Sequence, residues 1–211
     1  IRRQRQMCIR DRTCIQGLMQ GVVGQFVKED VAIDVFKTGR GRPWGEHHEC
    51  CFCGTERFFR PAYATHLLEE WIPALEGVEE KLRNGAKVAD IGCGLGTSSI
   101  LMAENFPNST IHAYDFHAPS IEEARKRAES KRLKNVEFFV ADAADVSDEG
   151  YDLACIFDAW HDMGDPVGVA KAIRKKLTDD GTFMVVDPMA LDGLQNNNEN
   201  NPGAGMFYGF G

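Results

Sequence analysis

The segment 90–97, Asp-Ile-Gly-Cys-Gly-Leu-Gly-Thr, is where residue types and spacing most clearly predict chemistry in this 211-residue chain. Gly92, Gly94 and Gly96 directly follow an apolar run that is typical of a β-strand. Glycine adopts positive φ angles and lets a ligand touch the backbone, and the N-terminus of a following helix favours polar ligand groups. We therefore expect this loop to bind a small molecule.

Asp115 lies where such a ligand would place a ribose. It follows Gly94 by 21 residues and ends the second apolar run, and a carboxylate there can accept hydrogen bonds from both ribose hydroxyls. The nicotinamide fingerprint G-x-G-x-x-G is not met, because Thr97 occupies the place of its third glycine. The chain also lacks a Tyr-x-x-x-Lys pair. An NAD(P)-dependent oxidoreductase is therefore the less favoured alternative.

The pattern Asp-x-Gly-x-Gly-x-Gly resembles motif I of class I S-adenosylmethionine-dependent methyltransferases. The resemblance implies that the loop backbone holds the amino-acid tail of the methyl donor and that Asp90 orients its ammonium group. It also implies that Phe116 flanks the adenine and that Asp142 accepts the adenine amino group, with Ala143 beside the ring. Each residue alone is an ordinary loop residue, so the prediction depends on their combined spacing. The residues expected to bind S-adenosylmethionine are Asp90, Gly92, Cys93, Gly94, Gly96, Thr97, Asp115, Phe116, Asp142, Ala143, Phe157 and Asp158.

A histidine follows the fourth apolar run, at the sheet edge where open α/β folds bind ligands. Methyl transfer to a hydroxyl requires a base, and His161 is the candidate. His161 and Asp162 resemble the His-Asp-Trp segment of small-molecule O-methyltransferases, although Met163 replaces the tryptophan. The alternative is that His161 and Asp165 only shape the loop and begin the next helix. We expect a small-molecule methyl acceptor, with O-methylation through His161 as the specific hypothesis.

The bulk composition narrows the expected partners and compartment. A net charge of −8 disfavours nucleic acid, and the basic residues within 125–132 are mixed with glutamate as on a solvated helix face. The chain has no run of about 18 apolar residues and no signal-peptide pattern, which predicts a cytoplasmic protein without membrane attachment. Seven scattered cysteines, an odd number, are typical of reduced thiols.

From residue 87 onward, short runs rich in Val, Ile and Phe alternate with amphipathic stretches. This alternation predicts an α/β fold with a parallel sheet and helices on both faces. The resemblance implies the Rossmann-like class I methyltransferase sheet of seven strands in the order 3-2-1-4-5-7-6, of which five are present. The expected strands are 88–91, 110–114, 136–140, 151–157 and 182–186. The expected helices are 97–105, 120–133, with Ser120 and Glu123 as its capping box, and 166–177.

Sequence outside this alternating region is less regular. Residues 1–12 are basic and aperiodic and resemble translated adapter sequence, so we interpret them as non-native. We interpret residues 13–60 as a linker or a remnant of an N-terminal region. Residues 61–211 are predicted to be a methyltransferase domain that begins with two short helices and is truncated at its C-terminal end. Beyond Pro188, the Asn- and Gly-rich sequence predicts no further strand or helix.

Residues 44–63 combine aromatic side chains with His and Cys. Together with residues 68–75, this stretch resembles bacterial methyltransferases whose N-terminal winged-helix domain mediates dimerisation or frames the acceptor pocket. That domain is essentially missing here, so we expect truncation at both ends and a homodimer only through the missing domain. The crowded His and Cys residues lack a second ligand pair at normal spacing, and we expect no metal. The aromatic and histidine side chains of this stretch would either cover the ligands or form ordinary interdomain packing. The residues that would cover the ligands are Trp44, His47, Phe58, Phe59 and Tyr63.

A second class of function is a non-catalytic protein that binds S-adenosylmethionine as a regulator or acts as an interaction module. The fifth predicted strand, 182–186, would form an exposed apolar edge, because no later strand is predicted to cover it. Such an edge is prone to association. A donor-binding interaction protein therefore remains the alternative to an enzyme.

Overall fold

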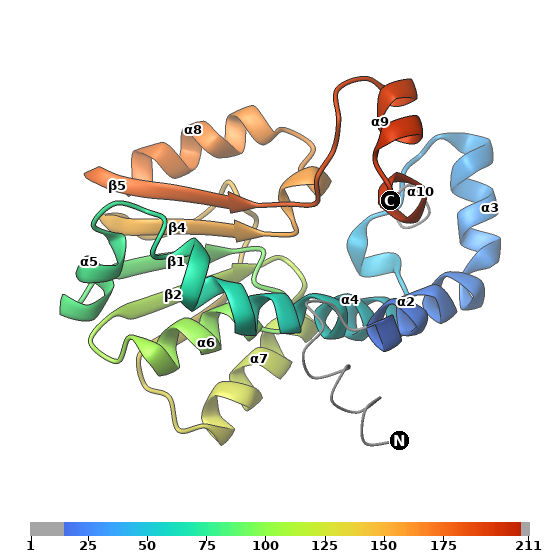
Figure 1. The fold of residues 1–211 in the computed structure, drawn as a ribbon. Helices are drawn as coiled ribbons and strands as arrows, with labels where there is room; N and C mark the ends of the chain where they lie inside the picture. Colours follow the sequence, from blue (N-terminus) through green and yellow to red (C-terminus); the bar gives the residue numbers. More distant parts are fainter. Residues whose placement is uncertain (1–14, 208–211) are drawn as a thin grey trace, which may run out of the picture.

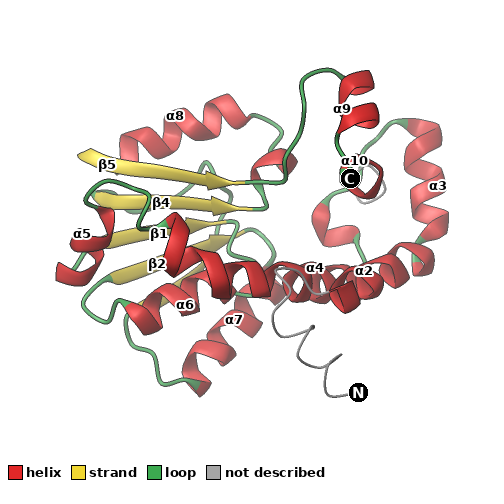
Figure 2. Ribbon diagram, viewed as in Figure 1, coloured by secondary structure: helices red, strands yellow, loops and turns green. Residues whose placement is uncertain are grey.

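The computed structural model describes residues 15–207, which form an α/β fold around a parallel five-stranded sheet (Figures 1 and 2). The strand order β3-β2-β1-β4-β5 confirms the predicted Rossmann-like class and matches the family order over these five strands. Residues 1–12, predicted to be non-native, lie outside the described residues. The strands are β1 (Lys87–Ile91), β2 (Thr110–Asp115), β3 (Val136–Val140), β4 (Tyr151–Phe157) and β5 (Leu177–Val186).

The register of the central strands brings their carboxyl ends together. Ile91, the last residue of β1, pairs with Tyr114 of β2 and with Ile156 of β4. The residues that follow each strand therefore meet at one edge of the sheet. Open parallel sheets bind their ligands at this edge.

Helices cover both faces of the sheet, as its nearly continuous apolar strands require. Residues of α5 (Val78–Asn84) and α6 (Thr97–Asn105) pack in one core cluster with side chains of the sheet, and α7 (Ala118–Ser130) extends the cover of that face. Residues of α8 (Pro166–Lys176) belong to a second cluster with β1 and β4 (Figure 1). The sheet is thus the middle layer of three.

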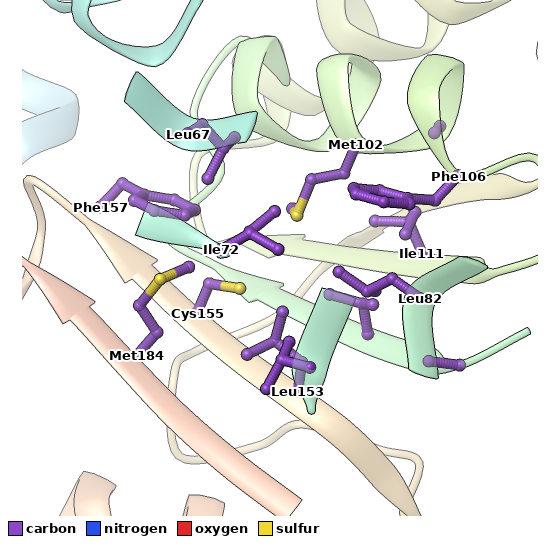
Figure 3. Close-up of a cluster of buried hydrophobic side chains, with 14 of the residues drawn as sticks. Leu67, Ile72, Leu82, Met102, Phe106, Ile111, Leu153, Cys155, Phe157 and Met184 are labelled. Atoms are coloured by element: carbon purple, nitrogen blue, oxygen red, sulfur yellow. The ribbon is translucent and has the colours of Figure 1, made fainter. Parts of the chain in front are cut away.

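The largest core cluster anchors the strands and the helix on either side of the glycine loop. Figure 3 shows Met102 of α6 and Phe106, the residue after α6, near Ile111 of β2, with Leu82 of α5 and Leu153 of β4 in the same cluster. Each of these five side chains is at most 3% exposed. Burying one such side chain contributes roughly 1.5–3 kcal/mol. The packing therefore fixes the position of α6 relative to β1, and this placement determines the geometry of the loop that connects them.

Helix α7 begins two residues earlier than the sequence predicts. Its N-cap is His117, so Ser120 lies in the first turn and the predicted capping box of Ser120 with Glu123 is wrong. Pro119 explains the earlier start, because its fixed φ suits the first turn of a helix. Ser120 instead forms a 2.8 Å hydrogen bond with Nδ1 of His117.

The segment predicted as a linker is largely helical where the structure describes it. Helix α4 continues directly into η2, a π-helical stretch, so this helical run passes through the boundary predicted at residues 60 and 61. The domain boundary itself stays a prediction. The elements are α2 (Ile15–Val27), α3 (Glu29–Thr38), the 3-10 helix η1 (Trp44–Glu46), α4 (Glu49–Ala62) and η2 (Tyr63–Trp71).

Glycines explain how α2 packs against α4. A Cβ atom on Gly54 would lie 2.5 Å from the backbone nitrogen of Gly21 and 2.7 Å from the backbone oxygen of Gly17. The two helix backbones therefore approach each other more closely than any larger side chain would allow. Hydrophobic periodicity does not register such a glycine contact, so the sequence did not predict that these two helices pack together.

Two short helices, α9 (Leu194–Asn200) and α10 (Ala204–Phe207), follow β5. The expectation that no helix lies beyond Pro188 is therefore wrong. Buried asparagines hold this segment: Asn197 Oδ1 accepts a hydrogen bond from the N–H of Leu191, and the Asn201 amide donates to the carbonyl of Met189. Side-chain to backbone hydrogen bonds, rather than apolar periodicity, order these residues.

Within residues 15–207, no strand pairs with the outer edge of β5, as predicted for this strand. Val185 on this edge strand is 40% exposed. None of the described helices combines the length and the apolar character that crossing a bilayer needs.

Candidate functional site

A cavity of about 1620 Å³ lies at the carboxyl edge of the sheet. The glycine loop and the residues after β2, β3 and β4 form one part of its lining, and residues of α2, α3, α4 and 188–204 form the other. Figure 1 shows these helices beyond the ends of the strands. The N-terminal helices are therefore part of the site. The side chains predicted to cover the ligands all line this cavity: Trp44, His47, Phe58, Phe59 and Tyr63.

The loop between β1 and α6 turns tightly at its glycines. Gly92 and Gly96 have φ angles of 75° and 77°. A Cβ on Gly92 would lie 2.8 Å from Cβ of Ala159, and a Cβ on Gly96 would lie 2.8 Å from the Phe138 ring. Gly94, which lines the cavity, would place a Cβ in open space with nothing within 4 Å. Two glycines therefore permit close packing, and the third presents its backbone to the cavity.

Asp115 is hydrogen-bonded to the glycine loop. Its Oδ2 accepts a 2.8 Å hydrogen bond from the N–H of Gly94, and its Oδ1 accepts one of 2.8 Å from the N–H of His117. Burial raises the pKa of Asp115, and these two hydrogen bonds oppose that shift. A carboxylate oxygen can accept more than one hydrogen bond. Asp115, which lines the cavity, can therefore still bind a ligand hydroxyl.

Asp90 is fully buried and is not among the residues that line the cavity. Its Oδ2 accepts hydrogen bonds from the hydroxyls of Ser98 at 2.6 Å and Ser99 at 2.5 Å, while its Oδ1 is buried without a hydrogen-bond partner. Burial raises its pKa to about 6. The carboxylate thus holds the first turn of α6, and the predicted effect on a donor ammonium group would need a bridging group.

The other predicted donor-binding residues near β1, β2 and β3 also line the cavity. Phe116 is 54% exposed, and Asp142 is exposed, with its Oδ1 accepting a 3.0 Å hydrogen bond from the N–H of Ala144. Ala143, the residue after Asp142, is half-buried. Cys93 is buried, and burial raises the pKa of its thiol well above the usual value, so it is not a thiolate nucleophile near neutral pH.

The end of β4 carries an unusual backbone conformation. Asp158 has a φ of 51°, a left-handed conformation that is uncommon for a residue other than glycine. Its carboxylate accepts a 2.5 Å hydrogen bond from the hydroxyl of Tyr63. The ring of Tyr63 also lies 5.6 Å from that of Phe157, between centroids. All three residues were predicted from the sequence to lie at the ligand site, but the contact between Tyr63 and Asp158 was not predicted.

His161 follows β4 on η3 (Trp160–Asp162) and lines the cavity. Its Nδ1 lies 2.9 Å from Oδ1 of Asp187, the residue after β5. Its Nε2 lies 3.7 Å from Oδ1 of Asp162, beyond hydrogen-bonding distance. Asp187, which reaches the site through His161, was not predicted from the sequence, although its place after an apolar strand was a usable signal.

Glu56 on α4 is the second missed residue. It lines the cavity and accepts a 2.7 Å hydrogen bond from the hydroxyl of Thr97 at the start of α6. Arg60 and Arg127 form ion pairs with the same carboxylate at 3.3 and 3.4 Å. Glu56 therefore joins the N-terminal helices to the glycine loop. No pattern in α4 marked it out from other glutamates.

The His- and Cys-rich segment has structural contacts. His48 caps α4 by accepting a 3.2 Å hydrogen bond from the N–H of Cys50, and Cys51 is buried against the carbonyl of Gly21. Cys53 is exposed. Across residues 15–207, no three His, Cys, Asp or Glu side chains gather as metal ligands.

Comparison with known proteins identifies a family. A family model described as a methyltransferase domain matches residues 82–206, more than half of the chain. Among solved structures, a protein from Galdieria sulphuraria named as a sarcosine dimethylglycine methyltransferase has a TM-score of 0.53 at 21% identity. That similarity covers 60% of this chain and 47% of the other, and it supports the fold.

Two curated relatives differ in the acceptor that their names state. The chain is 30% identical over 88 residues to ribosomal RNA small subunit methyltransferase C of Haemophilus influenzae, covering 42% of this chain and 26% of that protein. It is 24% identical over 159 residues to (S)-coclaurine N-methyltransferase of Thalictrum flavum subsp. glaucum, covering 74% of this chain and 42% of that protein. The chain thus spans less than half the length of either relative. Because one name specifies RNA, the relatives do not support the expectation that nucleic acid is excluded.

Proposed function

The chain belongs to the methyltransferase domain family, and from that premise we propose that it transfers a methyl group from S-adenosylmethionine to a small-molecule acceptor. The observation that carries the proposal is the hydrogen bond between Gly94 and Asp115, which joins an open glycine backbone to a carboxylate in one cavity wall. When bound, the donor would supply a methyl group on a positively charged sulfur. The residues of this chain would bind and orient it.

The donor fits along the carboxyl edge of the sheet. Asp142 and Phe116 would hold the adenine, Asp115 the ribose, and the glycine-loop backbone the amino-acid tail. The open space at Gly94 leaves room for a ligand against the backbone. The Oδ1 atom of Asp90 is buried without a hydrogen-bond partner. It therefore favours a positively charged group near the glycine loop, such as the donor ammonium.

His161 would remove a proton from the acceptor. In this proposal Nδ1–H donates to Asp187 at 2.9 Å, which leaves Nε2 as the nitrogen that accepts the proton. The carboxylate of Asp187 also stabilises the imidazolium that forms. The side chain of His161 is 48% exposed, so the proton can leave to solvent.

The charge of the cavity lining supports a small-molecule acceptor. Arg42 is the single Lys or Arg among the described residues that line the cavity, whereas Glu56, Asp158 and Asp162 also line it. Nucleic-acid binding relies on several cationic side chains that neutralise phosphates. A cavity lined by aromatic rings and few cations suits a compact apolar molecule better.

Calorimetric titration of S-adenosylhomocysteine tests the donor site. The wild-type chain should bind it with micromolar affinity, and Asp115→Ala should weaken binding at least about tenfold, since a carboxylate that accepts ligand hydroxyls is lost. The matched control is Asp145→Ala, an exposed acid in the loop after Asp142 that does not line the cavity. Absence of binding to a folded wild-type chain would contradict the proposal.

A transfer assay then tests the acceptor class. The methyl-labelled donor is offered with a panel of small hydroxyl and amine compounds and, separately, with total RNA. Transfer to the small compounds is the expected result, and transfer to RNA alone would contradict the acceptor class. Donor binding without transfer in either assay would favour the non-catalytic donor-binding alternative.

A further inference from the structure

Tyr63 and Asp158 form a pair that connects the helical part of the cavity to the sheet. The Tyr63 hydroxyl donates a 2.5 Å hydrogen bond to Oδ2 of Asp158, across 95 residues of sequence. Both residues line the cavity, and Tyr63 is only 8% exposed. The hydroxyl therefore has a specific partner inside the site.

The backbone on both sides of this pair departs from regular geometry. Asp158 is one of two non-glycine residues with positive φ among residues 15–207, the other being Arg132. Tyr63 is the first residue of η2, the π-helical continuation of α4. Left-handed residues and π-helical turns both occur preferentially at functional sites, where the surrounding structure holds them in place. Two independent departures thus meet at one hydrogen bond.

The pair lies beside the glycine loop. Gly92 packs so closely on the residue after Asp158 that a Cβ on Gly92 would lie 2.8 Å from Cβ of Ala159. In the sheet, β3, β2 and β1 are followed by β4. A donor with its ribose at Asp115 after β2 and its tail on the glycine loop after β1 has its sulfur at the ends of these two strands. The end of β4 lies directly beside the end of β1.

The carboxylates at this end of the cavity lack a basic partner other than histidine. Among the described residues, Asp162 and Asp187 form ion pairs only with His161, and Asp158 forms none. The pKa of Asp158 is raised to about 6, mainly by burial and also by the nearby Asp187, while the hydrogen bond from Tyr63 and the charge of His161 oppose that shift. The Tyr63 hydroxyl thus stabilises the ionised form of Asp158.

We propose that Asp158, oriented by Tyr63, faces the positively charged sulfur of the donor and makes the site discriminate S-adenosylmethionine from S-adenosylhomocysteine. This inference rests on the proposed function. When the acceptor lone pair bonds to the methyl carbon, the electron pair of the broken C–S bond stays on sulfur, which becomes neutral. The attraction to Asp158 is then lost, and the product leaves more readily than the donor. Tyr63 is a positioning residue in this scheme, because it acts through Asp158.

The test is the ratio of the two dissociation constants, measured by calorimetry without any acceptor. The wild-type chain should bind S-adenosylmethionine about tenfold or more tightly than S-adenosylhomocysteine, an energy of about 1.4 kcal/mol. Asp158→Asn removes the charge, and asparagine tolerates the left-handed backbone. This variant should bring the ratio close to one while S-adenosylhomocysteine affinity changes less than about threefold. Tyr63→Phe removes only the hydroxyl and should lower the ratio severalfold.

S-adenosylhomocysteine, the product, serves as the internal control in every variant. A merely structural role for Tyr63 would weaken both ligands equally and leave the ratio unchanged, which would overturn the inference. A wild-type ratio near one, or the same ratio in all three proteins, would also overturn it while leaving the proposed donor site intact. Failure of a folded wild-type chain to bind either ligand would overturn the proposed function as well.

Discussion

Asp187 and His161 come from segments that follow neighbouring strands, and they meet with 2.9 Å between Oδ1 and Nδ1. Strands β4 and β5 are paired so that Phe157 lies opposite Val186. The turns that follow these strands therefore lie side by side. The imidazole is held by one carboxylate, and its second nitrogen lies on the side away from that contact.

The first prediction concerns the tautomer of His161. Because Asp187 accepts from Nδ1, neutral His161 should carry its proton on Nδ1, and Asp187→Ala should shift the tautomer ratio toward Nε2–H about tenfold. The tenfold factor follows from the typical free-energy contribution of a hydrogen bond to a charged group. Nitrogen-15 NMR of labelled histidine measures the ratio. Asp162→Ala is the matched control and should leave it unchanged, since Asp162 lies 3.7 Å from Nε2. Equal tautomer ratios in wild type and Asp187→Ala would refute the assignment.

The second prediction separates the two kinds of glycine in the loop. Gly96→Ala should lower the free energy of unfolding by about 2–4 kcal/mol, because the new Cβ is strained at positive φ and meets Phe138 and Ala124 at 2.8 Å. Gly94→Ala shares the backbone strain but meets no neighbour, so it should cost only about 1 kcal/mol. Urea unfolding measures both. Gly94→Ala should instead weaken S-adenosylhomocysteine binding, because Gly94 lines the cavity and the new Cβ would occupy space that is open to the ligand. Equal destabilisation by the two substitutions would rule out this division.

The third prediction is the pH dependence of stability at Asp90. Burial raises its pKa to about 6 in the folded state, so the folded chain binds a proton that the unfolded chain has already released. This contribution is fully favourable below the unfolded pKa, near 4, and it is lost as the pH rises toward 6. The slope is at most about 1.4 kcal/mol per pH unit. Asp158, with a pKa of about 6, acts in the same direction.

Urea unfolding of wild type and Asp90→Asn between pH 4.5 and 7 isolates this contribution, and the stability of the wild type relative to the variant should fall as the pH rises. The comparison is needed because burial lowers the pKa of His47 to about 4, which acts in the opposite direction in the same window. The substitution leaves an amide that does not titrate, so its other effects form a constant offset across the pH range. Parallel pH curves for wild type and Asp90→Asn would show that Asp90 does not titrate in this window. The absolute stability of the variant plays no part in the comparison.

The fourth prediction concerns the contact between α2 and α4. Gly54→Ala would place a Cβ 2.5 Å from the backbone nitrogen of Gly21, so the helices must separate. Hydrogen exchange of the amides in α2 should become about tenfold faster, corresponding to a local loss of about 1.4 kcal/mol. Cys53→Ala is the control, because Cys53 is exposed on the same helix. Unchanged exchange in Gly54→Ala would show that the helices are not held by this contact.

The sequence predicted the elements from β1 to β5 because their signals are local. The apolar run 151–157 and the helix 97–105 have the predicted bounds, since each is flanked by turn residues and carries its own periodicity. The glycine loop was predictable for the same reason, because its residues are contiguous. The packing of α2 against α4 was not predicted, because glycine contacts such as that of Gly54 with Gly21 have no hydrophobic period.

The sequence by itself thus determined the class of sheet, the glycine loop and the candidate donor residues, because each depends on residues close together in the chain. Only the tertiary structure decided that Tyr63 binds Asp158, that Asp187 binds His161 and that Glu56 binds Thr97. Such pairs depend on the relative placement of separate elements. That placement is set by the summed packing of many side chains and by strand register, which no single segment encodes.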